Sequence, residues 1–388
     1  KIFLFLIQHN NFLVQEIEKD FPLRNWVKEF RNSFNQPPSL KGDNSKNIAT
    51  YTEKGHQIYS KIFEPIDSML EGVKSIVIIP DGILGYLPFE AILTEKPEFK
   101  ESFKSHQVLM KKYQISYEYA AAKLTTKSQH KRRVNQSNNL LAFAPTFQGD
   151  TTLLALRNID LKDNRNWLHP LKYNIEEVQK IKNIVGGDVY LDSIATKDNF
   201  IKNAPTYQIL HLSTHGKAND KVGDYSFIAF YEIMDSTENE WLYNKDIYGL
   251  NLDADMVVLS ACETGIGEIQ RGEGIISLAH GFSCAGAKSI ITSLWNVDDK
   301  ASMVLMENFY KYLHDGMEKD AALMRAKIDL RNNPNYQSPF YWASFIAIGD
   351  MSQIEFSNSR LLFFVLISIV VLALFRRYLL FYYKRGNL

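Results

Sequence analysis

Cysteine is scarce in this sequence: Cys262 and Cys284 are the only two among 388 residues. Two cysteines are too few for a disulfide framework or a four-cysteine zinc site. A charge excess is also lacking, because 44 lysine and arginine residues balance 44 aspartate and glutamate residues. Without a basic field the whole protein has no general attraction for nucleic acid, so we expect no nucleic-acid partner.

Sequence repeats of fixed period are absent, and the composition is that of an ordinary globular protein, with 45% hydrophobic and 23% charged residues. Global disorder is therefore not expected. The length exceeds that of a typical domain and favours one large α/β unit or two fused halves.

Apolar runs divide the chain into elements. Two runs around His9-Asn10-Asn11 predict a β-hairpin, and a helix is expected over about 20–34. The run 73–79 lacks alternation and predicts a strand buried on both faces. From residue 140 the pattern becomes regular: strands are predicted at 140–144, 208–212, 256–259 and 289–294, with helices near 175–185 and from about 274. This alternation predicts an α/β fold with a mainly parallel sheet flanked by helices.

A polar interval, Lys131-Arg132-Arg133 followed by residues 135–139, separates the two parts of this pattern. Short charge runs are usually solvated loops, and a processing site is the alternative. We place the boundary here. The expected domains are an N-terminal half at 1–135, which includes the hairpin, and a second half at 139–350.

Two predicted buried strands end in residues with chemical potential. The run 209–214 is followed by His215 and Gly216, and the run 256–261 is followed by Cys262 and a glycine turn. Active sites gather at the carboxyl ends of strands in open parallel sheets. Neighbouring strands would place the imidazole beside the thiol.

Acyl transfer to a cysteine needs a base and donors aimed at the oxyanion. His215 can supply the base, and the N–H groups of Gly216 and Cys262 can form the oxyanion hole. A lone strand-end cysteine or histidine is usually structural. The pair, at the ends of two buried strands and each followed by glycine, favours catalysis instead.

With these motifs the chain resembles the CHAT family of caspase-like peptidases, which often follow tetratricopeptide repeats. The separation of 47 positions from His215 to Cys262 is close to the roughly 50 typical of caspases. Further matching segments are Ile79-Pro80-Asp81-Gly82, Leu87-Pro88-Phe89-Glu90, Ala195-Thr196, Gly272-Glu273-Gly274 and Ser293-Leu294-Trp295-Asn296-Val297-Asp298. The resemblance implies a caspase-like fold, a Cys262–His215 dyad, a non-catalytic first half, a catalytic second half and a helical-repeat region upstream.

Trp295 and Asp298 follow a further strand close to the cysteine strand, and we expect them to bind substrate. An Asp298 carboxylate facing the pocket would favour a basic P1 residue. The structural alternative is that Asp298 or Asp299 caps the next helix.

His280 and Cys284 lie four residues apart on a predicted helix, as metal ligands would. Two further ligands are lacking, so we expect helix packing and no metal or other cofactor. The glycines at 265, 267, 272 and 274 lack the Gly-Lys-Ser/Thr ending of a phosphate loop.

The C-terminal run Leu361–Phe375 is uncharged over 15 residues, slightly short of the roughly 17 to 25 needed to span a bilayer. Extended past Arg376 and Arg377, the segment 360–383 predicts one transmembrane helix and a lipid bilayer as partner. The basic residues beyond it place the peptidase domain outside the cytoplasm, with a cytoplasmic tail-anchored protein as the alternative.

The sequence thus predicts a membrane-tethered cysteine endopeptidase that acts on protein or peptide substrates. A caspase-like interaction module without catalytic activity, signalling at the membrane, is the main alternative. A zinc-binding scaffold built on His280 and Cys284 is a weaker one.

Overall fold

The computed structural model describes residues 1–38, 44–96, 102–125, 138–147, 170–219, 221–232, 240–260, 268–270 and 274–356. The chain divides into two units, 1–354 and 355–388, and the architecture below is that of the first.

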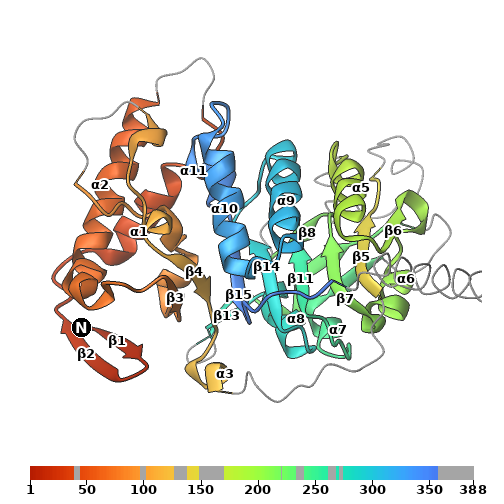
Figure 1. The fold of residues 1–388 in the computed structure, drawn as a ribbon, viewed down its shortest axis with the longest axis horizontal. Coiled ribbons are helices and arrows are strands. Elements are labelled where there is room, and N and C mark those ends of the chain that lie inside the picture. Colours follow the sequence, from red (N-terminus) through yellow and green to blue (C-terminus); the bar gives the residue numbers. More distant parts are fainter. Residues whose placement is uncertain are drawn as a thin grey trace, which may run out of the picture. The chain divides into compact units, whose positions relative to one another are not determined.

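An eight-stranded sheet, in the order β3-β4-β15-β14-β11-β7-β5-β6, forms the centre of this unit (Figure 1). All neighbouring pairs are parallel except β14 and β15. The carboxyl ends of β14, β11, β7, β5 and β6 therefore meet at one edge, and the mainly parallel sheet is confirmed. The strands are β3 (Ser75–Ile78), β4 (Gln114–Tyr117), β5 (Asn138–Ala144), β6 (Asp188–Leu191), β7 (Tyr207–Leu212), β11 (Met256–Leu259), β14 (Ser289–Ser293) and β15 (Phe345–Gly349).

Burial along the strands follows their place in the sheet. Every residue of the central strands β7 and β11 is buried, as their continuous apolar runs predict. Strand β3 was expected to be buried on both faces, and this is wrong: Val77 is 43% exposed. The reason is that β3 is the outermost strand and has only β4 beside it.

Helices cover both faces of the sheet. On one face α5 (Asn174–Val185), α9 (Asp299–His314) and α10 (Lys319–Asn332) lie side by side (Figure 1). On the other lie α6 (Lys197–Asn203), α7 (Asn244–Ile247) and α8 (Leu278–Cys284). The remaining α-helices among the described residues are α1 (Leu23–Asn32), α2 (Ser45–Ile62), α3 (Ala121–Thr125) and α11 (Pro339–Trp342).

Side-chain alternation explains why both faces are covered. On β7, His211 contacts α5 and α9. Phe143, which pairs with the next residue Leu212, stacks edge-on against Phe200 of α6. Adjacent strand residues point to opposite faces, so each face carries its own helix layer.

Smaller sheets flank the central one. The predicted hairpin is confirmed as β1 (Ile2–Gln8) paired with β2 (Asn11–Ile17). A three-stranded sheet contains β8 (Gly216–Lys217), β9 (Phe227–Ala229) and β10 (Trp241–Tyr243), and β12 (Glu268–Gln270) pairs with β13 (Gly274–Ile276). Because residues 274–276 are a strand, the helix expected from about 274 begins only at Leu278.

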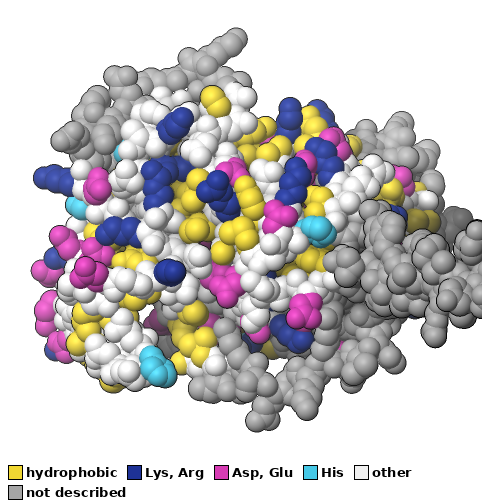
Figure 2. All heavy atoms as spheres, in the orientation of Figure 1, with side chains coloured by type: hydrophobic (Ala, Val, Ile, Leu, Met, Phe, Trp, Pro, Cys, Tyr) yellow, Lys and Arg dark blue, Asp and Glu magenta, His cyan; other side chains and the backbone are white. Residues whose placement is uncertain are grey.

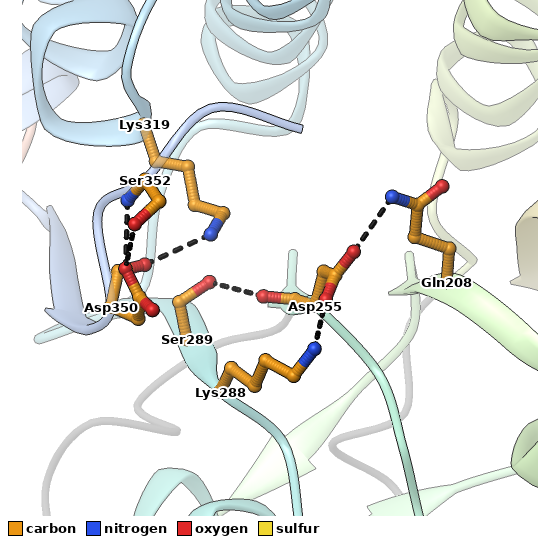
Figure 3. Close-up of polar contacts among 7 residues, drawn as sticks. All are labelled: Gln208, Asp255, Lys288, Ser289, Lys319, Asp350 and Ser352. Carbon is orange, nitrogen blue, oxygen red and sulfur yellow. Dashed lines mark hydrogen bonds and ion pairs between the residues drawn. The ribbon is translucent and has the colours of Figure 1, made fainter. Parts of the chain in front are cut away.

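A polar network closes the amino ends of β7, β11 and β14 (Figure 3). The Asp255 carboxylate accepts from Gln208 Nε2 at 2.7 Å and pairs with Lys288 Nζ at 2.6 Å. Ser289 Oγ donates to the Asp255 carbonyl at 2.7 Å. Next to it, Lys319 Nζ donates to the carbonyl of Asp350 at 2.9 Å, just after β15 ends.

A buried ion pair joins the early part of the chain to α10. Lys327 Nζ lies 2.8 Å from Glu90 Oε1, and Tyr117 donates its hydroxyl hydrogen to Glu90 Oε2 at 2.6 Å. All three side chains are buried. The charges of Lys327 and Glu90 and the Tyr117 hydroxyl are therefore compensated by one another rather than by water. On the surface, acidic and basic side chains both occur over the face in Figure 2.

The predicted transmembrane helix is wrong by the structure. Within the described ranges no helix has both the length and the apolar character to cross a bilayer. The longest, α2, carries Lys46, Glu53, Lys54 and Lys61. The segment 360–383 itself lies outside the described residues, and its charge-free core of 15 residues is shorter than a span requires. The membrane localisation, in either orientation, and the bilayer partner lose their support with it.

Candidate active site

The candidate base His215 follows β7, at the edge where the carboxyl ends of β14, β11, β7, β5 and β6 meet. Strands β7 and β11 are direct neighbours, and Leu212 pairs with Leu259 at their carboxyl ends. His215 comes three positions after Leu212, and Cys262 comes three positions after Leu259. Residues 261–267, and Cys262 with them, lie outside the described residues.

The backbone around His215 is fixed by β9. The His215 carbonyl accepts from Ala229 N at 2.9 Å, and Thr214 Oγ1 donates to the Ala229 carbonyl at 2.6 Å. Gly216 then opens β8 and pairs with Ile228. The strand therefore turns from the central sheet into the small sheet at His215.

The His215 side chain is buried and packs against an aromatic ring. Phe147, which follows β5, lies with its ring centroid 4.9 Å from that of His215 at an interplanar angle of 59°. Strand β5 neighbours β7 on the side away from β11. Phe147 was not among the residues singled out from the sequence.

Asn174, at the start of α5, connects the segments that carry these two rings. Its side-chain Nδ2 donates to the carbonyl of Pro145 at 2.9 Å and to that of Ser213 at 3.4 Å. Pro145 lies two residues before Phe147, and Ser213 lies two before His215. Asn174 is only 2% exposed, so these contacts form in the interior.

A second histidine on β7 belongs to a buried network. His211 Nε2 lies 2.8 Å from Glu177 Oε1 of α5, and Nδ1 lies 3.1 Å from the Tyr310 hydroxyl of α9. None of the three side chains is more than 1% exposed. Burial, and then the charge of Glu177, raises the pKa of Tyr310 well above its ordinary value. A histidine within an otherwise apolar strand run was the sequence signal for this network.

Trp295 is part of the core and is held by the first helix. It is 4% exposed, its Nε1 donates to the Phe340 carbonyl at 3.1 Å, and its ring lies 5.6 Å from that of Phe34. Arg31 Nη2 of α1 donates to the carbonyl of Leu294 at 3.2 Å. The segment after β14 therefore has a rigid backing.

Asp298 is exposed and caps α9, because its Oδ1 accepts from Ala301 N at 2.8 Å. The capping role considered from the sequence is thus observed. Tyr336 and Tyr341 are near: their pKa values are raised by burial and then by the Asp298 charge.

The neighbouring Asp299 accepts from two backbone N–H groups, those of Lys172 at 2.6 Å and Tyr173 at 2.9 Å. Burial raises the pKa of its carboxyl group, although these two hydrogen bonds act in the opposite direction. Asp299 therefore ties the segment before α5 to the start of α9.

His280 and Cys284 lie together on α8, as their spacing predicts. The Cys284 sulfur is 3.8 Å from His280 Nδ1 and 3.9 Å from Nε2, and Cys284 is exposed. Over the described parts of the chain, no group of three or more His, Cys, Asp or Glu residues is arranged to hold a metal ion.

The fold and motifs together define an α/β protein in which adjacent parallel strands lead to a His-Gly pair and to a cysteine. The family model described as CHAT domain matches residues 52–350. The chain belongs to the CHAT domain family.

The relatives that match this chain are much longer proteins. The chain is 22% identical over 311 residues to human "Tetratricopeptide repeat protein 28" (Homo sapiens) and 23% identical over 312 residues to its mouse (Mus musculus) counterpart. Each match covers 71% of this chain but 12% of the relative. The chain thus spans about an eighth of the length of these relatives.

Two solved structures resemble the fold at low identity. The complex of Porphyromonas gingivalis RgpB pro- and mature domains gives a TM-score of 0.48 at 10% identity, covering 85% of this chain and 76% of that chain. The Saccharomyces cerevisiae separase-securin complex gives 0.42 at 12% identity, covering 87% and 20%.

Proposed function

We propose that this CHAT domain is a cysteine endopeptidase in which Cys262 is the nucleophile and His215 the general base. The observation that carries the proposal is the matched offset on adjacent strands. Leu212 and Leu259 pair, and His215 and Cys262 each follow by three residues. Neighbouring strands lie roughly 4.8 Å apart, so the two segments that carry these residues begin at adjacent strand ends.

The proposed reaction has two steps. In the first, the Cys262 sulfur attacks the substrate carbonyl carbon, and His215 takes the thiol proton and delivers it to the leaving amine. In the second, His215 takes a proton from water as the water oxygen attacks the acyl carbon. His215 then returns this proton to the Cys262 sulfur as the C–S bond breaks and the carboxylic acid leaves. Backbone N–H groups of Gly216 and Cys262 are the proposed donors to the oxyanion in both steps.

For substrate binding we propose the segment after β14. The buried Trp295 gives this segment a rigid backing, and the exposed Asp298 supplies a carboxylate. Capping α9 engages Asp298 Oδ1, and a carboxylate has further acceptor positions. A lysine or arginine side chain at P1 is therefore the preferred substrate residue.

Electrophilic peptide ketones with Arg, Lys, Leu or Asp at P1 test the proposal. We expect covalent labelling of the wild-type protein, strongest with a basic P1 residue, and none of Cys262→Ala. Cys284→Ala is the matched control, because it removes the other thiol, which is exposed on α8. Labelling that persists in Cys262→Ala, or no labelling of the wild type by any ketone, would reject the peptidase.

An interaction module without turnover is the second candidate. The observation that favours it is the outer face of the N-terminal hairpin, where five large apolar side chains are 46–65% exposed: Phe3, Phe5, Ile7, Phe12 and Val14. Contiguous apolar surface of this kind is typical of contact sites. The relatives are named as tetratricopeptide repeat proteins, so a helical-repeat region is the proposed partner.

The division into halves at 1–135 and 139–350 is also a proposal. Strands β3 and β4 come from the first part of the chain and lie together at one end of the sheet. Proteolysis between residues 131 and 139 would test it. The two products are expected to remain associated, because the buried Glu90–Lys327 pair joins them.

A further inference from the structure

The side-chain amide of Asn174 continues the hydrogen bonding between the β5 and β7 segments where the pairing of the two strands stops. The last ladder bond runs from Ser213 N to the Phe143 carbonyl at 2.9 Å. In a parallel ladder the next donor would be the N–H of residue 145, to the Ser213 carbonyl. Residue 145 is proline and has no N–H. Asn174 Nδ2 donates to the Ser213 carbonyl in its place.

The amide nitrogen and the amide oxygen of Asn174 both form hydrogen bonds here. Its two N–H bonds serve two acceptors, the carbonyls of Ser213 and Pro145. Its Oδ1 accepts from Ile175 N at 2.9 Å. An aspartate of the same shape has no N–H to offer and would set a carboxylate against two carbonyl oxygens.

Both acceptors lead directly to the candidate base. Ser213 is two residues from His215, and Pro145 is two residues from Phe147, whose ring packs on His215. Asn174 therefore fixes the backbone that carries the imidazole and the backbone that carries its packing partner. Misplacement of a reacting group by about 1 Å costs on the order of a hundredfold in rate.

Helix α5 is itself anchored to the same strand. Glu177 lies one turn after Asn174 on α5, and its carboxylate binds His211, four residues before His215. Tyr310 of α9 completes this contact. The helix thus meets β7 at two polar points, and Asn174 is the one nearer to His215 along the chain.

We propose that Asn174 is a positioning residue for His215, holding the imidazole at the geometry required to take the Cys262 proton. This role rests on the proposed peptidase function. Asn174 acts through backbone carbonyls and needs no contact with substrate.

The test uses a Cys284→Ser background, in which Cys262 is the sole thiol. Alkylation by iodoacetamide is followed against pH by intact mass, and inactivation by the best peptide ketone is resolved into kinact and KI. The variants are Asn174→Ala and the isosteric Asn174→Asp. Asn139→Ala is the matched control, because Asn139 Nδ2 also donates to a carbonyl, that of Val185 at 2.9 Å, at the other end of α5.

In both Asn174 variants we expect kinact to fall about tenfold to a hundredfold with KI within about twofold of the parent. The alkylation midpoint should move toward the roughly 8.5 of an ordinary thiol. Asn139→Ala should change neither. Should Asn174→Asp fail to fold, Asn174→Ser supplies one donor and should give a loss between those of the parent and Asn174→Ala.

Unchanged kinact and midpoint in the folded Asn174 variants, or an equal loss in Asn139→Ala, would overturn the role. Failure of the peptidase proposal looks different. If His215→Ala leaves the parent alkylation profile unaltered, the Cys262–His215 pairing is wrong, and the role of Asn174 falls with it.

Discussion

The amino edge of the central sheet, where β7, β11 and β14 begin, and the carboxyl edge, where they end, use polar side chains in different ways. At the amino edge, Gln208 and Lys288 both bind the Asp255 carboxylate, and the charges of Lys288 and Asp255 offset each other (Figure 3). At the carboxyl edge, Asn174 and Asp299 bind backbone carbonyls and N–H groups of connecting segments. The first arrangement links the starts of β7, β11 and β14 to one another. The second fixes loop backbone, which a catalytic site requires.

This difference predicts that mutations at the carboxyl edge act mostly on activity and those at the amino edge mostly on stability. Strand β7 reaches both edges, with Gln208 near one end and His215 beyond the other. Variants of residues that follow, precede or pack against this strand and its neighbours can therefore break or sharpen the contrast.

The largest effect is expected for His215→Ala. Ketone labelling of Cys262 should fall by at least a hundredfold, since loss of a general base costs about 10²–10⁴ in rate. The melting temperature should change by only a few degrees. Rate and thermal unfolding are measured on the same preparation. A variant with normal labelling would remove His215 from the reaction and erase the contrast between the edges.

Glu177→Ala should cost about 3 kcal/mol of unfolding free energy. It leaves the fully buried His211 Nε2 without its partner, and breaking a buried polar pair is expensive. Denaturant unfolding measures the loss. Glu176→Ala is the matched control one residue away: its exposed pair with Lys180 should contribute less than about 1 kcal/mol. Equal losses in the two variants would show that the buried network adds no stability.

Much of the fold could be predicted because its signals are local. The apolar runs of β7 and β11 predict buried parallel strands, and the two runs around His9 predict the hairpin. The outer position of β3 could not be predicted, since an apolar run does not say whether a second neighbour is present. The membrane helix was a wrong prediction from an apolar run of marginal length.

The site was predictable only in part. His215 stands out because a His-Gly pair follows a buried strand. Asn174 has no such signal, since its acceptors Pro145 and Ser213 lie 29 and 39 residues away in the sequence. The burial of Trp295 depends partly on helix α1, whose Arg31 contacts Leu294 across 263 residues. Such contacts are set by the tertiary fold alone.

At the amino edge, Asp255→Ala should lower the unfolding free energy by about 1–2 kcal/mol and leave ketone labelling unchanged. The substitution removes the acceptor of both Gln208 and Lys288. Lys288 is partly exposed, so water compensates for its share of the loss, whereas Gln208 is buried. Chemical unfolding and the labelling rate are the two measurements. A fall in labelling rate without a loss of stability would contradict the division between the edges.

The smallest effect is a pH dependence at the carboxyl edge. Burial raises the folded-state pKa of Asp299, so its contribution to stability is complete below the unfolded pKa and is lost as pH rises through the folded pKa. Asparagine keeps an acceptor for the N–H groups of Lys172 and Tyr173 and does not titrate. The unfolding free energy of Asp299→Asn, relative to wild type, should therefore increase with pH across the acidic range.

Glu307, on the same helix, gives the opposite sign. Hydrogen bonding to Lys311 lowers its pKa, with Lys180 adding to the effect, so the stability it contributes is lost as pH falls. Glu307→Gln should become less stable than wild type as pH rises. Unfolding curves at several pH values between about 3 and 7 separate the two slopes, because the unfolded carboxyl groups titrate near 4. Parallel slopes for the two variants would mean that burial does not govern Asp299, and the carboxylate at the carboxyl edge would then behave like any surface ion pair.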